Sequence, residues 1–320
     1  MIKPVLFVTG LGRDLNRAEN LKCLYDSYPG EKKMIALSDA SYNDEAHSGK
    51  YGLMIIDIFP TEHPMPTIMI WHAIQGGKYI GLDDKRTYYR ESYARFMDAI
   101  IVAGCGGIDM FNQCTKVPRE RIFDLGMPRT DRYVNKRKGS GHTAMADKRG
   151  YLYVPTFRSI GETPMPGINW DWIDRQLTDD ELLIVKSHPY GENHYLPRYK
   201  HIMEADRMKP SVDYLYDADV VITDYSSIMF DAYLLNRPVV LFEKRPGYVR
   251  TRGMYLEYPE KYCSRYAMDE EYLLEQIRSA KRLRTAEKRC RDYVADACDG
   301  HSCERIINFI EEMLENGTST

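Results

Sequence analysis

Short apolar runs, several of them rich in β-branched residues, recur along the first 130 residues of the chain. They are VLFV at 5–8, MIAL at 34–37, LMIIDI at 53–58, TIMIW at 67–71, AIIVAG at 99–104 and RIFDLG at 121–126. Longer polar or helix-periodic stretches separate several of these runs. Because buried strands that alternate with helices are typical of a mostly parallel sheet, the pattern predicts one α/β half here.

A second series of apolar runs begins at residue 151. Its members are YLYVPTF at 151–157, ELLIVKSHP at 181–189, DADVVITDYSS at 217–227 and RPVVLFEK at 237–244. Each run ends in polar or charged residues, and open α/β sheets bind ligands beyond the carboxyl ends of their strands. We therefore predict a second Rossmann-like half and expect the two halves to face each other across a cleft.

The charged, glycine-containing stretch 131–150 separates the two series and predicts a linker. We place an N-terminal half at 1–140, a second half at 141–300 and a final segment at 301–320. In the final segment, five apolar residues share one helical face: Ile306, Ile307, Ile310, Met313 and Leu314. With Ser302 as the expected N-cap, this segment predicts a docking helix that crosses back to the first half.

Length, charge and cysteine content narrow the classes of function. The chain has 320 residues, 43% of them hydrophobic, which is enough for two cores. A formal net charge of −3 offers no general attraction to nucleic acid, so an anionic ligand must be bound locally. The seven cysteines include no CxxC pair, which argues against a disulfide framework and a zinc site and favours a reducing compartment.

The start of the chain and its apolar runs bear on location. The first residues are typical of a buried strand rather than of a leader peptide. No run approaches the ~20 apolar residues of a membrane span. We expect a cytoplasmic protein.

The segment ADVVITDYSSIMFDAYLLNRPVVLF at 218–242 carries a candidate phosphate site. A strand ends before Asp224, and we expect a helix that begins near Ser226 and ends before Pro238. Backbone N–H groups at a helix start, joined by the hydroxyls of Ser226 and Ser227, suit a diphosphate. Serine N-capping without any ligand explains the segment equally well.

Two histidines follow predicted strands, one in each half. His188 lies in KSHP at 186–189, where it is placed to donate to a phosphate or to protonate a leaving oxygen. His72 is the second residue of WHAIQGGK at 71–78, where it precedes Lys78 and glycines that let the backbone approach a ligand. For each histidine a purely structural role is the alternative: satisfying loop backbone for His188, and packing beside a tryptophan for His72.

Basic side chains extend these candidates. Arg129 in GMPRTD and Arg158 in VPTFR each follow a predicted strand, and a guanidinium is a planar donor suited to phosphate. A surface ion pair explains either arginine as well. The basic stretch 278–291 suits an anionic membrane surface, although such a run is more often the solvated face of a helix.

Taken in order, six segments resemble the CDP-glycerol glycerophosphotransferase family, which includes the teichoic-acid primases and polymerases. They are WHAIQGGKYIG, GMPRTD, VPTFR, KSHP, ITDYSSIMFDAYLLNRPVVLF and DACDGHSCERI, spanning residues 71–306. The first segment departs from the family form WHGTPLKK, because it has Ala73 and then Gly76 and Gly77 before Lys78. It lies nearer another form, WHAxGAxK, although its Gln75-Gly76 is shifted against the glycine of that form.

The resemblance implies a GT-B-like fold of two Rossmann-like domains. It implies transfer of glycerol phosphate from CDP-glycerol, or of ribitol phosphate from CDP-ribitol, to a hydroxyl of a lipid-linked or capsular glycan, with release of CMP. The enzyme would then act at the inner face of the membrane by peripheral contact. Apart from the resemblance, the sequence shows no clustered His, Cys and carboxylate spacing, so we expect no metal site and no cofactor, with a loosely held Mg²⁺ on the diphosphate as the alternative.

The same resemblance implies roles for individual residues. His72 is expected to be the general base that takes the proton from the acceptor hydroxyl, and His188 is expected to hold the donor diphosphate. Donor contacts are expected from Thr223, Asp224, Ser226, Ser227, Arg158 and Lys186. Acceptor or phosphate contacts are expected from Lys78 and Arg129.

Two other functions fit the same segments. A GT-B glycosyltransferase or an epimerase-like enzyme that uses a UDP- or GDP-sugar would need the same architecture and diphosphate site. A non-catalytic nucleotide-binding subunit would keep the TDYSS segment and lose the site in the first half. The presence of both His72 and Lys78 argues against this non-catalytic alternative.

Overall fold

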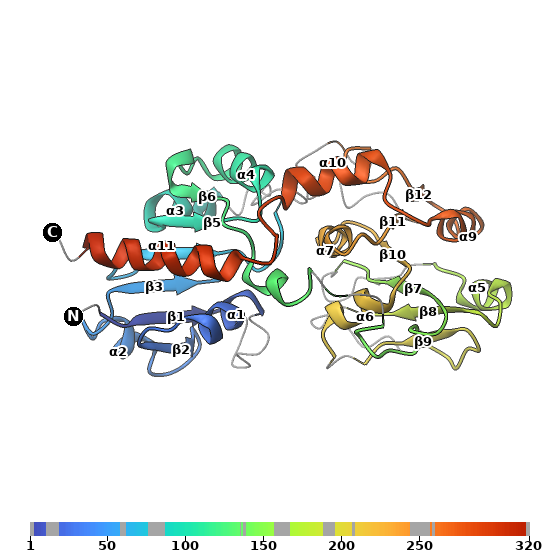
Figure 1. Cartoon of the computed structure of the whole chain (residues 1–320), viewed down its shortest axis with the longest axis horizontal. Helices are drawn as coiled ribbons and strands as arrows, with labels where there is room; N and C mark the ends of the chain where they lie inside the picture. The colour runs from blue at the N-terminus through green and yellow to red at the C-terminus, as the bar shows by residue number, and fades with distance from the viewer. Residues whose placement is uncertain are drawn as a thin grey trace. The chain divides into compact units, whose positions relative to one another are not determined.

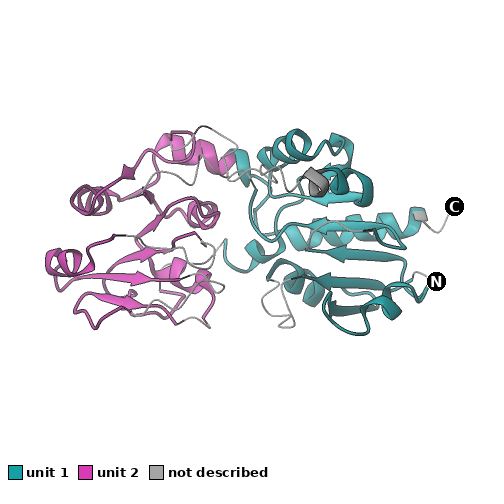
Figure 2. Ribbon diagram, turned by 180° about the vertical axis from the view of Figure 1, so that it is seen from behind, with its two compact units in different colours: residues 1–134, 293–320 teal, residues 135–292 magenta. Residues whose placement is uncertain are grey.

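The chain divides into two compact units (Figure 2). The computed structural model describes residues 3–10, 19–57, 62–75, 87–134, 136, 139–156, 167–187, 196–206, 209–243, 257 and 260–317. Unit 1 comprises Met1–Val134 and Tyr293–Thr320, and unit 2 comprises Asn135–Asp292. The division thus falls at 134 and 292, whereas we placed the boundaries at 140 and 300 from the sequence.

Unit 1 contains a parallel sheet in the strand order β2-β1-β3-β4-β5-β6 (Figure 1). Its strands are β1 (Val5–Thr9), β2 (Lys32–Ala36), β3 (Leu53–Ile56), β4 (Thr67–Ile70), β5 (Ala99–Ile101) and β6 (Ile122–Phe123). The described helices are α1 (Glu19–Ser27), α2 (Tyr42–Ala46), α3 (Thr87–Phe96), α4 (Cys105–Thr115) and α11 (Ser302–Gly317), with 3-10 turns η3 (Arg119–Arg121) and η4 (Pro128–Arg132). The strand order reverses between β1 and β3, and such a switch point is where open α/β sheets bind ligands.

Unit 2 contains a second parallel sheet in the order β12-β11-β10-β7-β8-β9. Its strands are β7 (Arg149–Tyr153), β8 (Glu181–Val185), β9 (Ile202–Glu204), β10 (Val220–Thr223), β11 (Val239–Phe242) and β12 (Tyr266–Ala267). The described helices are α5 (Trp170–Gln176), α6 (Ser211–Asp217), α7 (Ile228–Leu234), α9 (Glu270–Ser279) and α10 (Thr285–Val294), the last of which ends in unit 1. If β7 is counted as the first strand of this unit and β12 as the sixth, the order from the β9 edge is 3-2-1-4-5-6, which is the strand order of the Rossmann fold. The order reverses between β7 and β10, which is the switch point of this sheet.

The predicted α/β class with two Rossmann-like halves is confirmed, and each apolar run of the sequence contains a strand. The runs do not predict β9 or β12, because Ile202–Glu204 and Tyr266–Ala267 lie among polar and charged residues and belong to none of the apolar runs. That the two halves face each other across a cleft stays a prediction.

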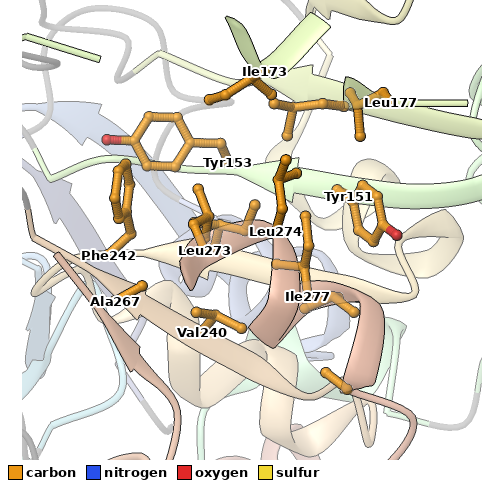
Figure 3. Packing of buried hydrophobic residues seen from close by; sticks show 14 of the residues in the cluster. Tyr151, Tyr153, Ile173, Leu177, Val240, Phe242, Ala267, Leu273, Leu274 and Ile277 are labelled. Carbon is orange, nitrogen blue, oxygen red and sulfur yellow. The ribbon is translucent and has the colours of Figure 1, made fainter. Parts of the chain in front are cut away.

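The core of unit 2 forms between its sheet and helix α9 (Figure 3). The side chain of Asp269 caps this helix by accepting a hydrogen bond from the Tyr272 N–H. Leu273, Leu274 and Ile277 of α9 are then buried against strand residues that include Tyr153 and Val240. Because the face of the sheet is filled by apolar side chains, polar chemistry is left to the strand ends.

Helix α11 packs on unit 1, the unit that also holds the N-terminal half of the chain (Figure 1). Ile306, Ile310 and Leu314 are buried, as their helical spacing predicts. The ring of Phe309 lies 4.5 Å from that of Phe123 in β6. The last helix therefore belongs to the core of the first half of the sequence.

Our prediction that Ser302 caps α11 is wrong. In the described part of the chain its buried hydroxyl has no hydrogen-bond partner. Instead, the carboxylate of Asp131 accepts hydrogen bonds from the N–H groups of Ser302 (3.0 Å) and Cys303 (2.7 Å). A carboxylate from η4 thus takes the place of a local cap and also suits the positive end of the helix dipole.

Candidate functional site

Two loops meet at the switch point of unit 2, where β7 and β10 lie side by side. The carboxylate of Asp224 accepts hydrogen bonds from the N–H groups of Thr156 (2.8 Å) and Tyr225 (2.6 Å). The hydroxyl of Thr223 donates to the carbonyl of Val154 at 2.5 Å. Both side chains are buried, so Thr223 and Asp224 fix the shape of the two loops that follow the strands.

The two serines of the TDYSS segment follow directly and are half-buried. Ser227 stands at the N-cap position of α7, but its side chain makes no capping hydrogen bond. The alternative in which this serine serves only as a helix cap therefore does not describe Ser227. As predicted, α7 ends before Asn236, whose left-handed φ of 55° stops the helix.

Lys186 lies at the end of β8 and is buried. Its ammonium group donates to the carbonyl of Asp206 at 2.9 Å and lies 5.8 Å from the centre of the Tyr214 ring. These contacts tie the end of β8 to the segment before α6. Three further predicted site residues, His188, Arg158 and Lys78, lie outside the described residues.

The switch point of unit 1 carries a buried acid, Asp57, which directly follows β3. Its carboxylate accepts hydrogen bonds from the hydroxyl of Thr9 (2.9 Å) and the N–H of Gly10 (3.0 Å), so it joins the loops after β1 and β3. Burial raises the pKa of Asp57 to about 6, although its hydrogen bonds act in the opposite direction. We do not single out Asp57 from the sequence, yet a carboxylate directly after four buried residues is a signal that would find it.

His72 is exposed and follows β4 at the same carboxyl edge of the sheet. The ring of its neighbour Trp71 packs against two other aromatic rings: its centre lies 5.6 Å from that of Phe111 and 6.1 Å from that of Tyr93. The Trp71 and His72 rings lie 4.8 Å apart. The tryptophan is thus the anchored member of the pair, and the imidazole is presented to solvent.

Arg129 and His72 are brought together, although they lie 57 positions apart in the sequence. The Arg129 guanidinium donates to the carbonyl of His72 at 2.8 Å, and Glu19 lies 3.8 Å from the same guanidinium nitrogen. The backbone N–H of Arg129 in turn donates to Asn20. Arg129 therefore contacts the backbone of the candidate base.

The described residues offer neither a metal site nor a membrane-spanning helix. No group of three or more His, Cys, Asp and Glu side chains there is arranged to hold a metal ion. None of the helices in those ranges has the length and apolar character needed to cross a bilayer.

Comparison with known proteins identifies the family. The family described as CDP-glycerol:poly(glycerophosphate) glycerophosphotransferase matches residues 45–312. A teichoic acid glycerol-phosphate primase of Bacillus subtilis is 28% identical over 269 residues, which cover 77% of this chain and 68% of the relative. A teichoic acid poly(ribitol-phosphate) polymerase of Bacillus spizizenii is 25% identical over 285 residues, which cover 81% of this chain and 46% of the relative.

Solved structures show the same fold. The wall teichoic acid polymerase TagF superimposes with a TM-score of 0.77 at 17% identity, covering 99% of this chain and 90% of that one. A UDP-N-acetylglucosamine 2-epimerase from Rickettsia bellii gives a TM-score of 0.60 at 13% identity, covering 99% and 98%. At such identities the likeness shows the fold alone.

The family match and the named relatives favour glycerophosphate transfer over the sugar-nucleotide alternative. The likeness to the epimerase structure supports that alternative by fold alone. The match also covers more than half of the chain. The prediction from the six sequence segments is confirmed: the chain belongs to the CDP-glycerol:poly(glycerophosphate) glycerophosphotransferase family.

Proposed function

We propose that this glycerophosphotransferase moves glycerol phosphate from CDP-glycerol to a hydroxyl of a lipid-linked or polymeric glycan of the teichoic-acid type, and releases CMP. The observation that carries the proposal is an exposed histidine, His72, at the carboxyl end of β4 in a chain of this family. An exposed imidazole beside an anchored backbone suits general-base catalysis, because it can reach a substrate without losing its position.

In the proposed reaction, His72 takes the proton of the acceptor hydroxyl. The acceptor oxygen then forms a bond to the phosphorus that bears the glycerol, and the bond from that phosphorus to the bridging oxygen of CMP breaks. In-line transfer of this kind depends mainly on positioning and on stabilisation of charge. No covalent bond to the protein is needed.

Unit 2 is proposed to bind the donor. His188 would hold the diphosphate together with Arg158 and the hydroxyls of Ser226 and Ser227, since each of the four can donate hydrogen bonds and follows a strand of unit 2 in the sequence. The buried residues Thr223, Asp224 and Lys186 would contribute through the loops they hold. A loosely held Mg²⁺ on the diphosphate would leave turnover sensitive to a chelator.

On the acceptor side, Lys78 is proposed to contact a phosphate of the acceptor. The donor itself is proposed to be CDP-glycerol, with CDP-ribitol as the competing substrate, because relatives named for glycerol phosphate and for ribitol phosphate both match this chain. Rates of CMP release from the two donors, measured with one acceptor, would separate them.

We also propose that the enzyme reaches a lipid-linked acceptor by peripheral contact with the membrane. The exposed basic residues just before and within α10 include Lys281, Arg282, Lys288 and Arg289. The acidic residue between them, Glu287, is buried and paired with Arg265, so it does not offset their charge at the surface. Anionic lipid attracts such a group of charges.

A direct test of the base assignment is the release of CMP from CDP-glycerol in the presence of a lipid-linked acceptor. His72→Ala should lower this rate by roughly 10²- to 10⁴-fold, the usual contribution of a general base. Thermal stabilisation by CDP should survive in the variant and should exceed stabilisation by UDP or GDP.

The matched control is His47→Ala, which removes another exposed histidine of unit 1, located just after α2. That variant should keep the wild-type rate. Wild-type CMP release by His72→Ala would refute the role of His72, and stabilisation by UDP rather than CDP would refute the donor.

A further inference from the structure

The backbone on either side of the proposed base is held by side chains from distant parts of unit 1. Trp71 and His72 lie just past the end of β4, where a carbonyl group no longer has a partner in the sheet. The carbonyl of Trp71 accepts a hydrogen bond from Nδ2 of Asn20 at 2.9 Å. The carbonyl of His72 accepts one from Nη1 of Arg129 at 2.8 Å. Two consecutive peptide groups are therefore each fixed by a separate side chain.

Asn20 and Arg129 are also joined to each other. Oδ1 of Asn20 accepts a hydrogen bond from the backbone N–H of Arg129 at 3.1 Å. The four residues thus form a closed ring of contacts that links the first turn of α1, the end of β4 and η4. Movement of the base backbone would require at least one of these hydrogen bonds to break.

The asparagine at position 20 suits this ring in a way that other residues do not. Its amide presents a donor to a carbonyl and an acceptor to an N–H group, so only one orientation of the amide satisfies both partners. Asn20 is 2% exposed, and a buried amide that loses a partner is costly. An aspartate there would place a carboxylate oxygen against the carbonyl of Trp71.

Aromatic contacts also hold the side chain of Trp71, the residue before the proposed base. The Trp71 ring is packed on Phe111 and Tyr93, while the ring of His72 is exposed. Packing fixes the side chain of Trp71, and hydrogen bonds fix the backbone that follows it. The imidazole of His72 is thus the exposed side chain of a segment whose backbone and tryptophan are held in place.

We propose that Asn20 and Arg129 are positioning residues for His72. They act through the backbone carbonyl groups of Trp71 and of His72 itself. Arg129 thereby has a role besides the phosphate contact expected from the sequence. The proposal rests on the proposed function only in taking His72 as the base. A misplacement of about 1 Å at a catalytic group costs up to roughly 10²-fold in rate.

The test uses the full chain labelled with ¹³C-histidine and two measurements. The first is the Cε1–Hε1 cross-peak of the His72 imidazole, identified by its absence in His72→Ala. The second is the split between kcat and KM in the CMP-release assay. Asn20→Ala, Asn20→Asp and Arg129→Gln should each move the cross-peak and lower kcat by roughly 10- to 100-fold, with KM for CDP-glycerol within about twofold of wild type.

Arg129→Lys provides a graded comparison, because one ammonium donor can still reach the carbonyl of His72. It should retain more activity than Arg129→Gln. Since Arg129 lies nearer the surface than Asn20, its variants keep the test informative even where a substitution of the buried asparagine prevents folding.

Two control variants match the chemistry without touching the base. Asn112→Ala removes an asparagine that donates to the carbonyl of Val117 at 2.8 Å, at the end of α4. Arg132→Gln removes the neighbouring arginine of η4, which pairs with Asp26. Both should leave the His72 cross-peak and kcat as in wild type.

Each outcome decides the proposal. An unchanged cross-peak and kcat in the Asn20 and Arg129 variants would overturn it, and so would an equal loss of kcat in Asn112→Ala, which would indicate a general effect of stability. If the wild-type protein releases no CMP, the proposed function fails, and the cross-peak alone still shows whether Asn20 and Arg129 position the imidazole.

Discussion

At the scale of single residues, the two units share one device at their switch points. In unit 1, Asp57 follows β3 and binds the loop after β1 through Thr9 and Gly10. In unit 2, Asp224 follows β10 and binds the loop after β7 through Thr156. In each case a carboxylate holds together the loops of the two strands between which the strand order reverses. The loops at both switch points are thus held in shape by hydrogen bonds within the protein.

Asp57 should make the stability of the protein depend on pH. Because its folded pKa of about 6 lies above the ordinary value of 3.8, the folded protein holds this proton more tightly than the unfolded chain does. Stability from this group is therefore fully present below pH 4 and is lost as pH rises through 6. Asp57→Asn has no such proton. Between pH 4 and pH 7 its free energy of unfolding should therefore rise relative to that of wild type by up to about 3 kcal/mol.

Urea unfolding at several pH values checks this expectation. Asp44→Asn, a change of an exposed aspartate in the same unit, serves as the control and should follow wild type at every pH. A difference between Asp57→Asn and wild type that stays constant from pH 4 to pH 7 would contradict the assignment of the raised pKa to Asp57.

The sequence identifies residues at strand ends but not the distant residues that hold them. His72, Asp224 and Ser227 follow apolar runs and belong to recognisable segments, so local pattern and resemblance find them. Asn20 and Asp57 act on partners 51 and 48 positions away, and no period or motif reveals such a contact. Their roles depend on the strand order, which the apolar runs do not specify.

At the scale of elements, η4 and the start of α11 support each other. The segment GMPRTD contributes Asp131, whose carboxylate caps α11. Gly126 of the same segment has a φ of 89°, and a Cβ atom there would come within 2.4 Å of the Ala297 carbonyl oxygen. Two segments of the family resemblance, GMPRTD and DACDGHSCERI, are therefore parts of one packed structure.

Gly126→Ala should destabilise unit 1 on two grounds. Its left-handed φ disfavours any side chain, and the added methyl group would collide with backbone that cannot easily move. Strain of this kind costs roughly 1–3 kcal/mol, with the steric contact in addition. Gly49→Ala isolates the two effects, because Gly49 has a φ of 68° and nothing within 4 Å of the added atom.

Thermal or urea unfolding of both variants measures the difference. The loss in Gly126→Ala should exceed that in Gly49→Ala, and the excess reports the contact with the residues before α11. Equal losses would mean that the left-handed backbone alone explains the glycine at position 126.

Elements also mark the limit of what the sequence predicts about the fold. Short apolar runs are sufficient to predict ten strands, since burial on both faces of a parallel sheet leaves a continuous apolar stretch. Helical spacing of apolar residues is sufficient to predict α11. The cap of α11 cannot be predicted in this way, because Asp131 lies 171 positions before Ser302, whose N–H group donates a hydrogen bond to it. Ser302 has the residue type of a cap, but it is the first residue of the helix itself and its hydroxyl is buried.

At the scale of the whole molecule, the family segments are divided equally between the two units. WHAIQGGKYIG, GMPRTD and DACDGHSCERI belong to unit 1, and VPTFR, KSHP and ITDYSSIMFDAYLLNRPVVLF belong to unit 2. The chain thus enters unit 2 once and returns through α10. The same helix carries part of the exposed basic group that we propose for membrane contact.

Charge on the whole molecule makes that membrane contact testable. With a net charge of −3, the protein as a whole is not attracted to anionic lipid, so binding must come from a local group of charges. Replacing Lys281, Arg282, Lys288 and Arg289 by Gln should remove most co-sedimentation with vesicles that contain phosphatidylglycerol, since each basic residue near such a surface contributes about 1 kcal/mol.

Replacing four exposed lysines elsewhere gives the same change in net charge and should have little effect: Lys50, Lys116, Lys136 and Lys261. Because surface attraction is screened by salt, wild-type binding should also weaken as ionic strength rises. Equal losses in the two quadruple variants would assign the interaction to net charge and not to α10, and the proposed docking face would have to be abandoned.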